Sequence, residues 1–182
     1  STLFPYTTLF RSLRRTLEYS GYEVKHVMNI TDVGHLTGDN DDGEDKMLKT
    51  SQETGRDVYE IARFYTDAFF SDTDELHIIR PSIACKATEH IDVMIALIQR
   101  LEKLGQTYIA GGNVYFSVDT FSDYGRLARL NLDELQSGAR IDIDPNKRNP
   151  KDFVLWFTKS KFENQAMLWD SPWGVGYPGW HI

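Results

Sequence analysis

The sequence predicts a mixed α/β fold: an α/β region, then a small α+β insertion, then a return to a core strand. Three observations favour this class. A strand ending at Ile30 precedes several segments whose apolar residues recur at helical spacing. Residues 107–118 indicate two short strands around a Gly-Gly pair, which is a hairpin signal. The apolar run at residues 153–160 indicates a further strand.

In the first part of the chain, helices surround one strand. Residues 22–30 carry apolar side chains on both faces near their end, which predicts a buried parallel strand. A helix should end at Gly21 before this strand, and a short helix is expected over residues 44–54 after it. Two longer helices should begin at the capping residues Asp57 and Thr88.

Composition limits the class of protein. The 182 residues are enough for one sizeable core or two small ones, and 41% hydrophobic with 26% charged residues is ordinary for a soluble chain. No apolar run reaches about 18 residues, so no membrane-spanning helix is predicted. The net charge of −7 argues against a nucleic-acid clamp, which needs a basic face. With no export signal, we expect a cytoplasmic protein.

The first residues differ in character from the rest. Apolar side chains in residues 2–12 fit neither a helical nor a strand period cleanly. The same residues look like the translation of a sequencing-adapter oligonucleotide in one frame. We therefore expect residues 1–12 to be a non-native, adapter-derived scar and leave them out of the fold prediction; the alternative is an ordinary N-terminal arm.

The acidic loop at residues 37–45 invites a calcium-binding interpretation. The EF-hand register excludes it, because aligning the loop glycine on Gly43 places Gly38 and Lys49 where carboxylate ligands are needed. We expect a solvated acidic loop.

Three single residues of reactive type have plainer explanations. His35 follows the strand in a loop, where a lone histidine is more often exposed or hydrogen-bonded than catalytic. The one cysteine, Cys85, has no Cys or His at ligand spacing, so an inert side chain is expected, without a disulfide or a multi-cysteine metal site in this chain. His90 lies at the polar start of a helix, which favours a structural role.

Two clusters have both a functional and a structural interpretation. Asn29, Thr31 and Asp32 gather short polar side chains at the carboxyl end of the predicted parallel strand, where doubly wound sheets bind ligands. An ordinary strand-to-loop cap explains them equally well. The C-terminal loop interleaves aromatic residues with Pro and Gly, and composition favours core packing over a pocket. These aromatic residues are Trp169, Trp173, Tyr177 and Trp180.

Taken together, six blocks resemble the cysteinyl-tRNA synthetases in order and spacing. The blocks are GYEVKHVMNITDV, KATEHIDVMIALIQRL, GGNVYFSVDTFSDYGRL, NLDELQSGAR, KRNPKDFVLW and SPWGVGYPGWHI. The resemblance covers residues 13–182, and HLTGDNDDGEDK resembles a longer loop found in a subset of that family.

The resemblance implies an incomplete Rossmann-like class I synthetase catalytic domain with a small α+β connective insertion. Residues 13–105 would form part of the Rossmann-like domain with its helices, residues 106–150 the insertion, and residues 151–182 the truncated return to the catalytic core. Members of the family activate cysteine with ATP and transfer it to tRNA(Cys), so these are the implied partners. The complete enzyme is expected to be monomeric.

The resemblance also implies two site residues. Thr31 matches the family threonine beside the cysteine substrate, and Trp180 matches the tryptophan that walls the amino-acid pocket. The family's histidine signature, lysine loop and zinc ligands fall outside the matched blocks. We therefore expect no catalytic residue and no metal ligand to be retained here, and no activity from this chain alone. In the complete enzyme, zinc would select the substrate thiolate over a hydroxyl.

Two alternative functions remain open at this point. A cysteine ligase of mycothiol biosynthesis shares cysteine activation, so the matched blocks discriminate it poorly. A non-catalytic tRNA- or partner-binding module is the second, although the net charge of −7 counts against autonomous tRNA binding.

Overall fold

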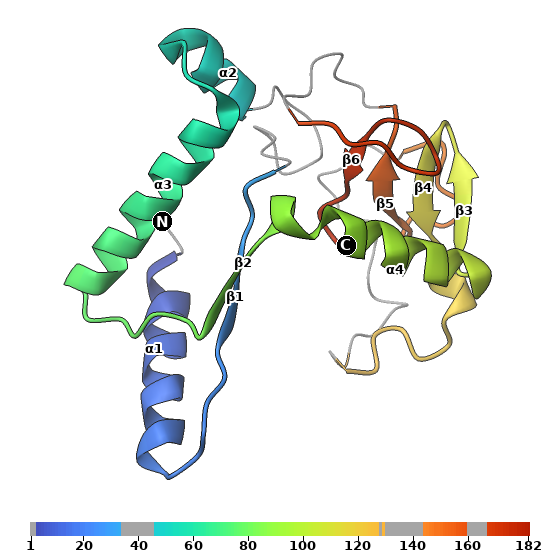
Figure 1. The fold of residues 1–182 in the computed structure, drawn as a ribbon. Coiled ribbons are helices and arrows are strands. Elements are labelled where there is room, and N and C mark those ends of the chain that lie inside the picture. The colour runs from blue at the N-terminus through green and yellow to red at the C-terminus, as the bar shows by residue number, and fades with distance from the viewer. Residues whose placement is uncertain (1–2, 34–45, 128, 130–143, 160–166) are drawn as a thin grey trace.

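The computed structural model describes residues 3–33, 46–127, 129, 144–159 and 167–182, and it shows a mixed α/β chain with two sheets (Figure 1). The predicted α/β class is confirmed. The first sheet is parallel and the second is antiparallel. Their strands are β1 (Val27–Ile30) and β2 (Ile83–Lys86) in the first sheet, and β3 (Thr107–Ala110), β4 (Asn113–Phe116), β5 (Phe153–Phe157) and β6 (Tyr177–Pro178) in the second.

The helices begin and end close to where capping residues predict. They are α1 (Leu3–Tyr19), α2 (Lys46–Thr54), α3 (Val58–Glu75) and α4 (Ile91–Lys103), with short 3₁₀ turns η1 (Ala87–His90) and η2 (Val118–Thr120). Asp57 caps α3 as predicted, since its carboxylate accepts a hydrogen bond from the Tyr59 amide at 2.8 Å. No helix in the described part of the chain is long and apolar enough to cross a membrane.

One predicted helix start is wrong, and one helix extends into residues that were left out of the fold prediction. Thr88 does not cap a long helix, because it lies inside η1 and α4 starts three residues later, at Ile91. The residues from 3 to 12 are helical although their apolar spacing is irregular, because α1 is continuous from Leu3 to Tyr19. A nucleated helix adds one hydrogen bond for each residue it gains, so it extends through segments of weak pattern. The adapter-derived origin of residues 1–12 stays a prediction.

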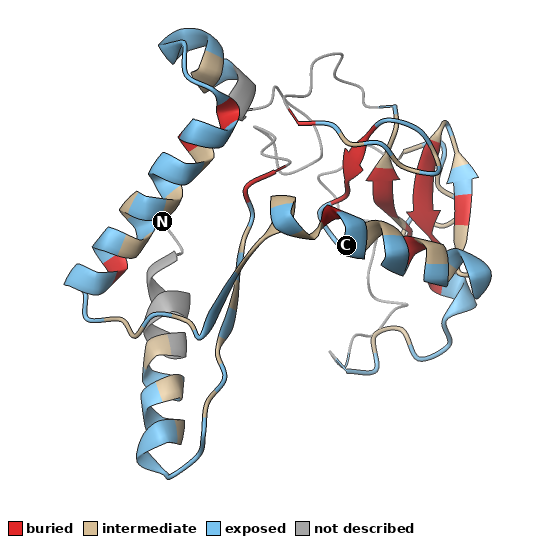
Figure 2. Ribbon diagram, viewed as in Figure 1, coloured by how far each residue is buried: buried red, intermediate tan, exposed pale blue. Residues whose placement is uncertain are grey.

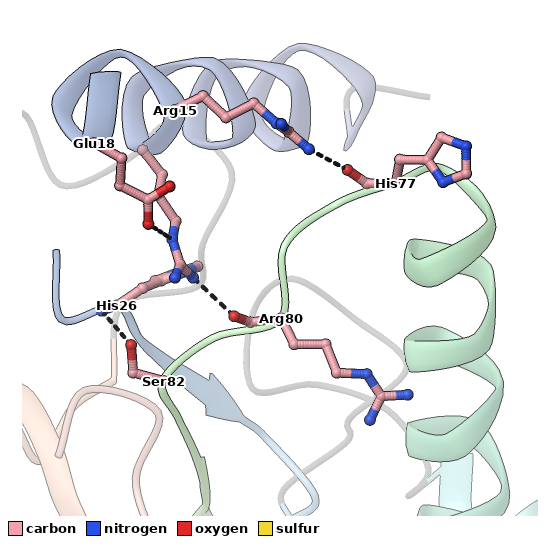
Figure 3. A network of polar contacts seen from close by, with 7 residues as sticks. Arg15, Glu18, His26, His77, Arg80 and Ser82 are labelled. Carbon is pink, nitrogen blue, oxygen red and sulfur yellow. Dashed lines mark hydrogen bonds and ion pairs between the residues drawn. The ribbon is translucent and has the colours of Figure 1, made fainter. Parts of the chain in front are cut away.

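Arginines on α1 hold the connector between α3 and β2 (Figure 3). The Arg14 guanidinium donates to the Arg80 carbonyl at 2.7 Å, and that of Arg15 donates to the His77 carbonyl at 2.9 Å. Beside them, the His26 amide donates to the Ser82 hydroxyl at 3.2 Å. These contacts fix the chain immediately before β1 and β2 pair.

The parallel strand predicted at residues 22–30 forms, but it is shorter and it is not buried. β1 pairs in parallel with β2 in the register Val27↔Ile83 to Ile30↔Lys86. Val27 is 50% and Ile83 42% exposed, and Figure 2 shows both strands without buried residues. Burial of a parallel strand requires helices over both faces, and within the described residues this sheet has only two strands.

The second sheet contains the main core. The predicted hairpin is confirmed, since β3 and β4 pair antiparallel across Gly111 and Gly112, which have φ angles of 57° and 93°. The strand predicted at residues 153–160 is β5, which pairs with β4. Helix α4 lies across this sheet (Figure 1). Their shared cluster comprises Ile91, Ile98, Val114, Phe116, Val118, Leu155 and Trp156.

Candidate functional site

The carboxyl ends of the two parallel strands lie at one edge of their sheet. β1 ends at Ile30 and β2 ends opposite it at Lys86. Thr31 follows β1 and is exposed, whereas Asp32, one residue further, is buried at 7% exposure. Such an edge is where open α/β sheets bind ligands. The exposed Thr31 side chain is therefore accessible at a favourable position.

Asp32 is bound to the chain that follows β2. Its carboxylate accepts two hydrogen bonds from Thr88, one from the amide at 2.9 Å and one from the hydroxyl at 2.6 Å. Hydrogen bonds to an ionised acceptor are stronger than neutral ones. Asp32 therefore holds the ends of the two strands together, which is the structural alternative considered for this residue.

The other polar groups at this edge also pair locally. Lys86 forms an ion pair with Glu89 at 3.3 Å, and its carbonyl oxygen lies 2.7 Å from His90 Nδ1. This contact agrees with the structural role expected for His90. Cys85 is partly buried and lies opposite Asn29 in the strand register.

The aromatic residues of the C-terminal loop divide into two kinds. Trp169 and Trp173 pack against the main core cluster, and Tyr177 is buried. Core packing, which composition favours, is confirmed for these three. Trp180 is 68% exposed, so core packing is wrong for this residue.

The backbone beside Trp180 lies tightly against β5. The Gly179 amide donates to the Leu155 carbonyl at 2.9 Å. A Cβ atom at Gly179 would overlap the Val154 carbonyl oxygen, and one at Gly176 would overlap that of Phe157. Only glycine allows this close approach of two backbones.

The residues after Trp180 are also anchored. The His181 ring packs edge-on against Phe153 with a centroid distance of 5.1 Å, and Ile182 packs against the main core cluster. Trp180 is therefore exposed although its neighbours on both sides are held in place.

One small apolar cluster connects the two segments that carry Thr31 and Trp180. Val33, two residues after Thr31, packs with Val58 and Met167. Trp169 packs against this cluster, and its backbone pairs with Gly176 in the loop that leads to Trp180. The cluster thus links the chain that follows Thr31 to the start of the loop that leads to Trp180, and a shared site for Thr31 and Trp180 stays a prediction.

A separate buried network stabilises the second sheet. Asp152, only 1% exposed, accepts hydrogen bonds from Tyr108 Oη at 2.8 Å, the Val118 amide at 2.9 Å and the Asn149 amide at 3.0 Å. Burial, followed by the hydrogen bond to Asp152, raises the pKa of Tyr108 to about 12. Every oxygen of this carboxylate has a partner, so its role is structural.

The described residues offer no donor set for a metal. No group of three or more His, Cys, Asp or Glu that could hold an ion occurs among them. His35 and the acidic loop at residues 37–45 lie outside the described residues. No zinc ligand is therefore assigned.

The sequence does not predict the partners of Asp32 and Gly179. The sequence predicts Thr88 as a helix cap, whereas its partner Asp32 is 56 residues away in the chain. Gly179 carries no local sign of its contact with β5. A match between distant hydrogen-bonding side chains has no periodic signal in a single sequence.

Comparison with known proteins places the chain in a family. The model of the tRNA synthetases class I (C) catalytic domain matches residues 6–182. A Cysteine--tRNA ligase of Treponema denticola is 67% identical over 170 residues, covering 93% of this chain and 35% of that protein. Those of Borrelia turicatae and Treponema pallidum are both 51% identical, covering 97% and 94% of this chain and 37% and 34% of those proteins. The chain spans about a third of the length of these curated relatives. With nearly all of its residues matched, the chain belongs to the catalytic-domain family of the class I (C) tRNA synthetases.

Proposed function

We propose that this chain is part of a cysteine--tRNA ligase, which activates cysteine with ATP to form cysteinyl-adenylate and transfers the cysteinyl group to tRNA(Cys). The observation that carries the proposal is 67% identity over 93% of the chain to a protein of that name. All three relatives compared carry this name. The mycothiol ligase and the non-catalytic module are therefore not favoured.

The proposed architecture follows the same relationship. Residues 13–105 belong to an incomplete Rossmann-like domain, residues 106–150 to a connective insertion and residues 151–182 to the return to the catalytic core. Parallel pairing of β1 and β2 around intervening helices supports the first assignment. Because β5 pairs with β4, the antiparallel sheet crosses the proposed boundary at residue 150.

Thr31 and Trp180 are proposed to contact the cysteine substrate. The Thr31 hydroxyl, exposed at the carboxyl edge of the parallel sheet, can hydrogen-bond to a polar group of the amino acid. The exposed Trp180 ring supplies an apolar wall that excludes water from the substrate side chain. Both side chains bind and orient the substrate, and neither transfers a proton.

The remaining requirements of the reaction are proposed for the whole protein. ATP is a substrate, tRNA(Cys) is the acceptor, and the complete enzyme acts as a cytoplasmic monomer. A zinc ion, when bound, would hold the substrate thiolate. The described residues supply no ligand set for it, so no step of the binding proposal depends on it.

The test uses a chimera in which this chain replaces the matched segment of the Treponema denticola ligase. The chimera should catalyse cysteine-dependent exchange of pyrophosphate into ATP, and the 182-residue chain alone should stay at background. A folded chimera without exchange activity would contradict the proposed function. Exchange by the chain alone would disprove its expected inactivity.

Variants of the chimera test the two site residues. Trp180→Phe and Thr31→Val should each raise the KM for cysteine, with smaller effects on the KM for ATP, and the melting temperature should stay within a few degrees. Trp173→Phe is the matched control, because Trp173 packs against the core. If Trp180→Phe lowers the melting temperature strongly and leaves the cysteine KM normal, the assignment of Trp180 is wrong.

A further inference from the structure

We propose that Asp32 and Thr88 are positioning residues for Thr31, which set the place of its hydroxyl relative to the cysteine substrate. This inference rests on the proposed function, in which Thr31 contacts cysteine. Neither residue needs to touch the substrate. Their effect is transmitted through the backbone on either side of Thr31.

The chain is fixed on both sides of Thr31. On one side, Ile30 is paired with Lys86 in the parallel sheet. On the other side, the Asp32 amide donates to the Ile30 carbonyl at 3.1 Å, which makes Thr31 the central residue of a three-residue turn. An exposed side chain at the tip of such a turn takes its position from the two residues that flank it.

The Thr88 contact determines the direction of this turn. Both Asp32 carboxylate oxygens are used, one by the Thr88 amide at 2.9 Å and one by its hydroxyl at 2.6 Å. Two hydrogen bonds restrict the rotation of this planar carboxylate, whereas a single hydrogen bond would leave it free to rotate. Because Asp32 is buried, an unpaired carboxylate there would be costly.

The apolar side of the turn is also held. Val33 is buried against Val58 and Met167, so the chain cannot relieve a broken Asp32–Thr88 contact by rotating as a unit. Loss of the contact should therefore appear locally, as displacement of Thr31. A local displacement of this kind predicts weaker binding of one substrate and not general unfolding.

The experiment measures exchange kinetics in the chimera. Thr88→Val removes the hydroxyl and keeps the volume, and it should raise the cysteine KM about threefold to tenfold and by no more than Thr31→Val does, because it acts only through the hydrogen bond that Thr31 makes to the substrate. The ATP KM should change by less than about twofold. Thr88→Ser keeps the hydroxyl and should restore the cysteine KM.

A matched control separates positioning from stability. The Thr66 hydroxyl also makes one partly buried hydrogen bond, to the Ala62 carbonyl at 2.7 Å, but it lies within α3. Thr66→Val makes the same change of side chain and should leave the cysteine KM unchanged, because its bond is local to α3. If both variants raise this KM equally, the effect is general and the inference fails.

The double variant distinguishes this inference from the proposed function. If Thr88 acts through Thr31, the Thr31→Val, Thr88→Val double variant should have the cysteine KM of Thr31→Val alone. If Thr31→Val has no effect on this KM, the proposed function of Thr31 is wrong. If Thr31→Val raises it and Thr88→Val does not, only the positioning role is wrong.

A second variant applies if Thr88→Val does not fold. Asp32→Asn keeps the shape and one strong acceptor but removes the charge, and it should raise the cysteine KM about threefold or more, since a neutral hydrogen bond is weaker by about half. An unchanged cysteine KM in folded Asp32→Asn would overturn the inference.

Discussion

The two sheets of this chain differ in how they are buried. The parallel pair of β1 and β2 is exposed or half-buried along its length, whereas β4 is buried throughout and β5 through its centre (Figure 2). The antiparallel sheet has α4 packed on one face and a stacked Tyr108–Tyr115 pair in its other cluster. Apolar residues in β1 and β2 are therefore not sufficient to bury these strands. Whether a strand is buried depends on the elements that pack against it.

The helices beside the two sheets show the same difference. On α4, Ile91 and Ile98 are buried against the antiparallel sheet. On α3, Val58 and Ile61 are buried, but Phe64 and Tyr65 are exposed. Both helices have apolar residues at helical spacing, but α3 buries only part of its apolar residues, whereas α4 packs on the antiparallel sheet. Exposed aromatic side chains such as Phe64 and Tyr65 are candidates for contact with other parts of a protein.

The largest expected difference between the two regions is in the free energy of unfolding that is lost when a single aromatic side chain is removed. Trp156→Ala should lower the free energy of unfolding of the chain by about 3–5 kcal/mol, because Trp156 is fully buried in the main core cluster. Tyr65→Ala on α3 should cost less than about 1 kcal/mol, because Tyr65 is 60% exposed. Urea unfolding followed by circular dichroism measures both. Equal losses would show that the two regions are equally well packed.

A smaller difference in the loss of unfolding free energy is expected when each of two glycines is changed to alanine. Gly179→Ala should cost about 1–3 kcal/mol, because the new Cβ overlaps the Val154 carbonyl and forces β6 away from β5. Gly21→Ala should cost about 1 kcal/mol, because space is open around it and only its φ of 86° favours glycine. The same unfolding measurement applies. A larger loss at Gly21 would mean that the backbone conformation next to β1 matters more than the close approach at β5.

The smallest expected effect is a dependence of stability on pH, and it is confined to the antiparallel sheet. Tyr108 has a pKa of about 12 in the folded chain, above its ordinary value of about 10, because it is buried and bonded to Asp152. The folded state therefore disfavours ionisation, so this stabilisation is complete below about pH 10 and is lost as the pH rises towards about 12. Burial raises the pKa of Tyr115 in the same direction.

Thermal unfolding between pH 9 and 12 measures this effect. Tyr108→Phe should be less stable than the parent at pH 9, and the difference should shrink as the pH rises towards about 12. Tyr19→Phe is the control, because Tyr19 is 95% exposed at the end of α1. A constant difference between Tyr108→Phe and the parent across this range would contradict the role of Tyr108 ionisation.

Much of the secondary structure could be predicted because its signals are local. The Gly111–Gly112 pair predicts the hairpin, and Asp57 predicts the start of α3. Thr31 and Trp180 were selected by resemblance, and the structure leaves both exposed. Their role in binding cysteine stays a prediction. The predicted cap at Thr88 is wrong because a threonine before an apolar run has the same local pattern whether it caps a helix or bonds to a distant carboxylate.

The sequence by itself determined where most helices and strands lie and which family the chain resembles, because periodicity, capping residues and motif order are properties of neighbouring residues. Only the tertiary structure decided which strands are buried, that β5 pairs with β4, and that Asp32 bonds to Thr88 across 56 residues. Burial and long-range pairing depend on which surfaces meet when the chain closes, and a single sequence carries no local pattern for that choice.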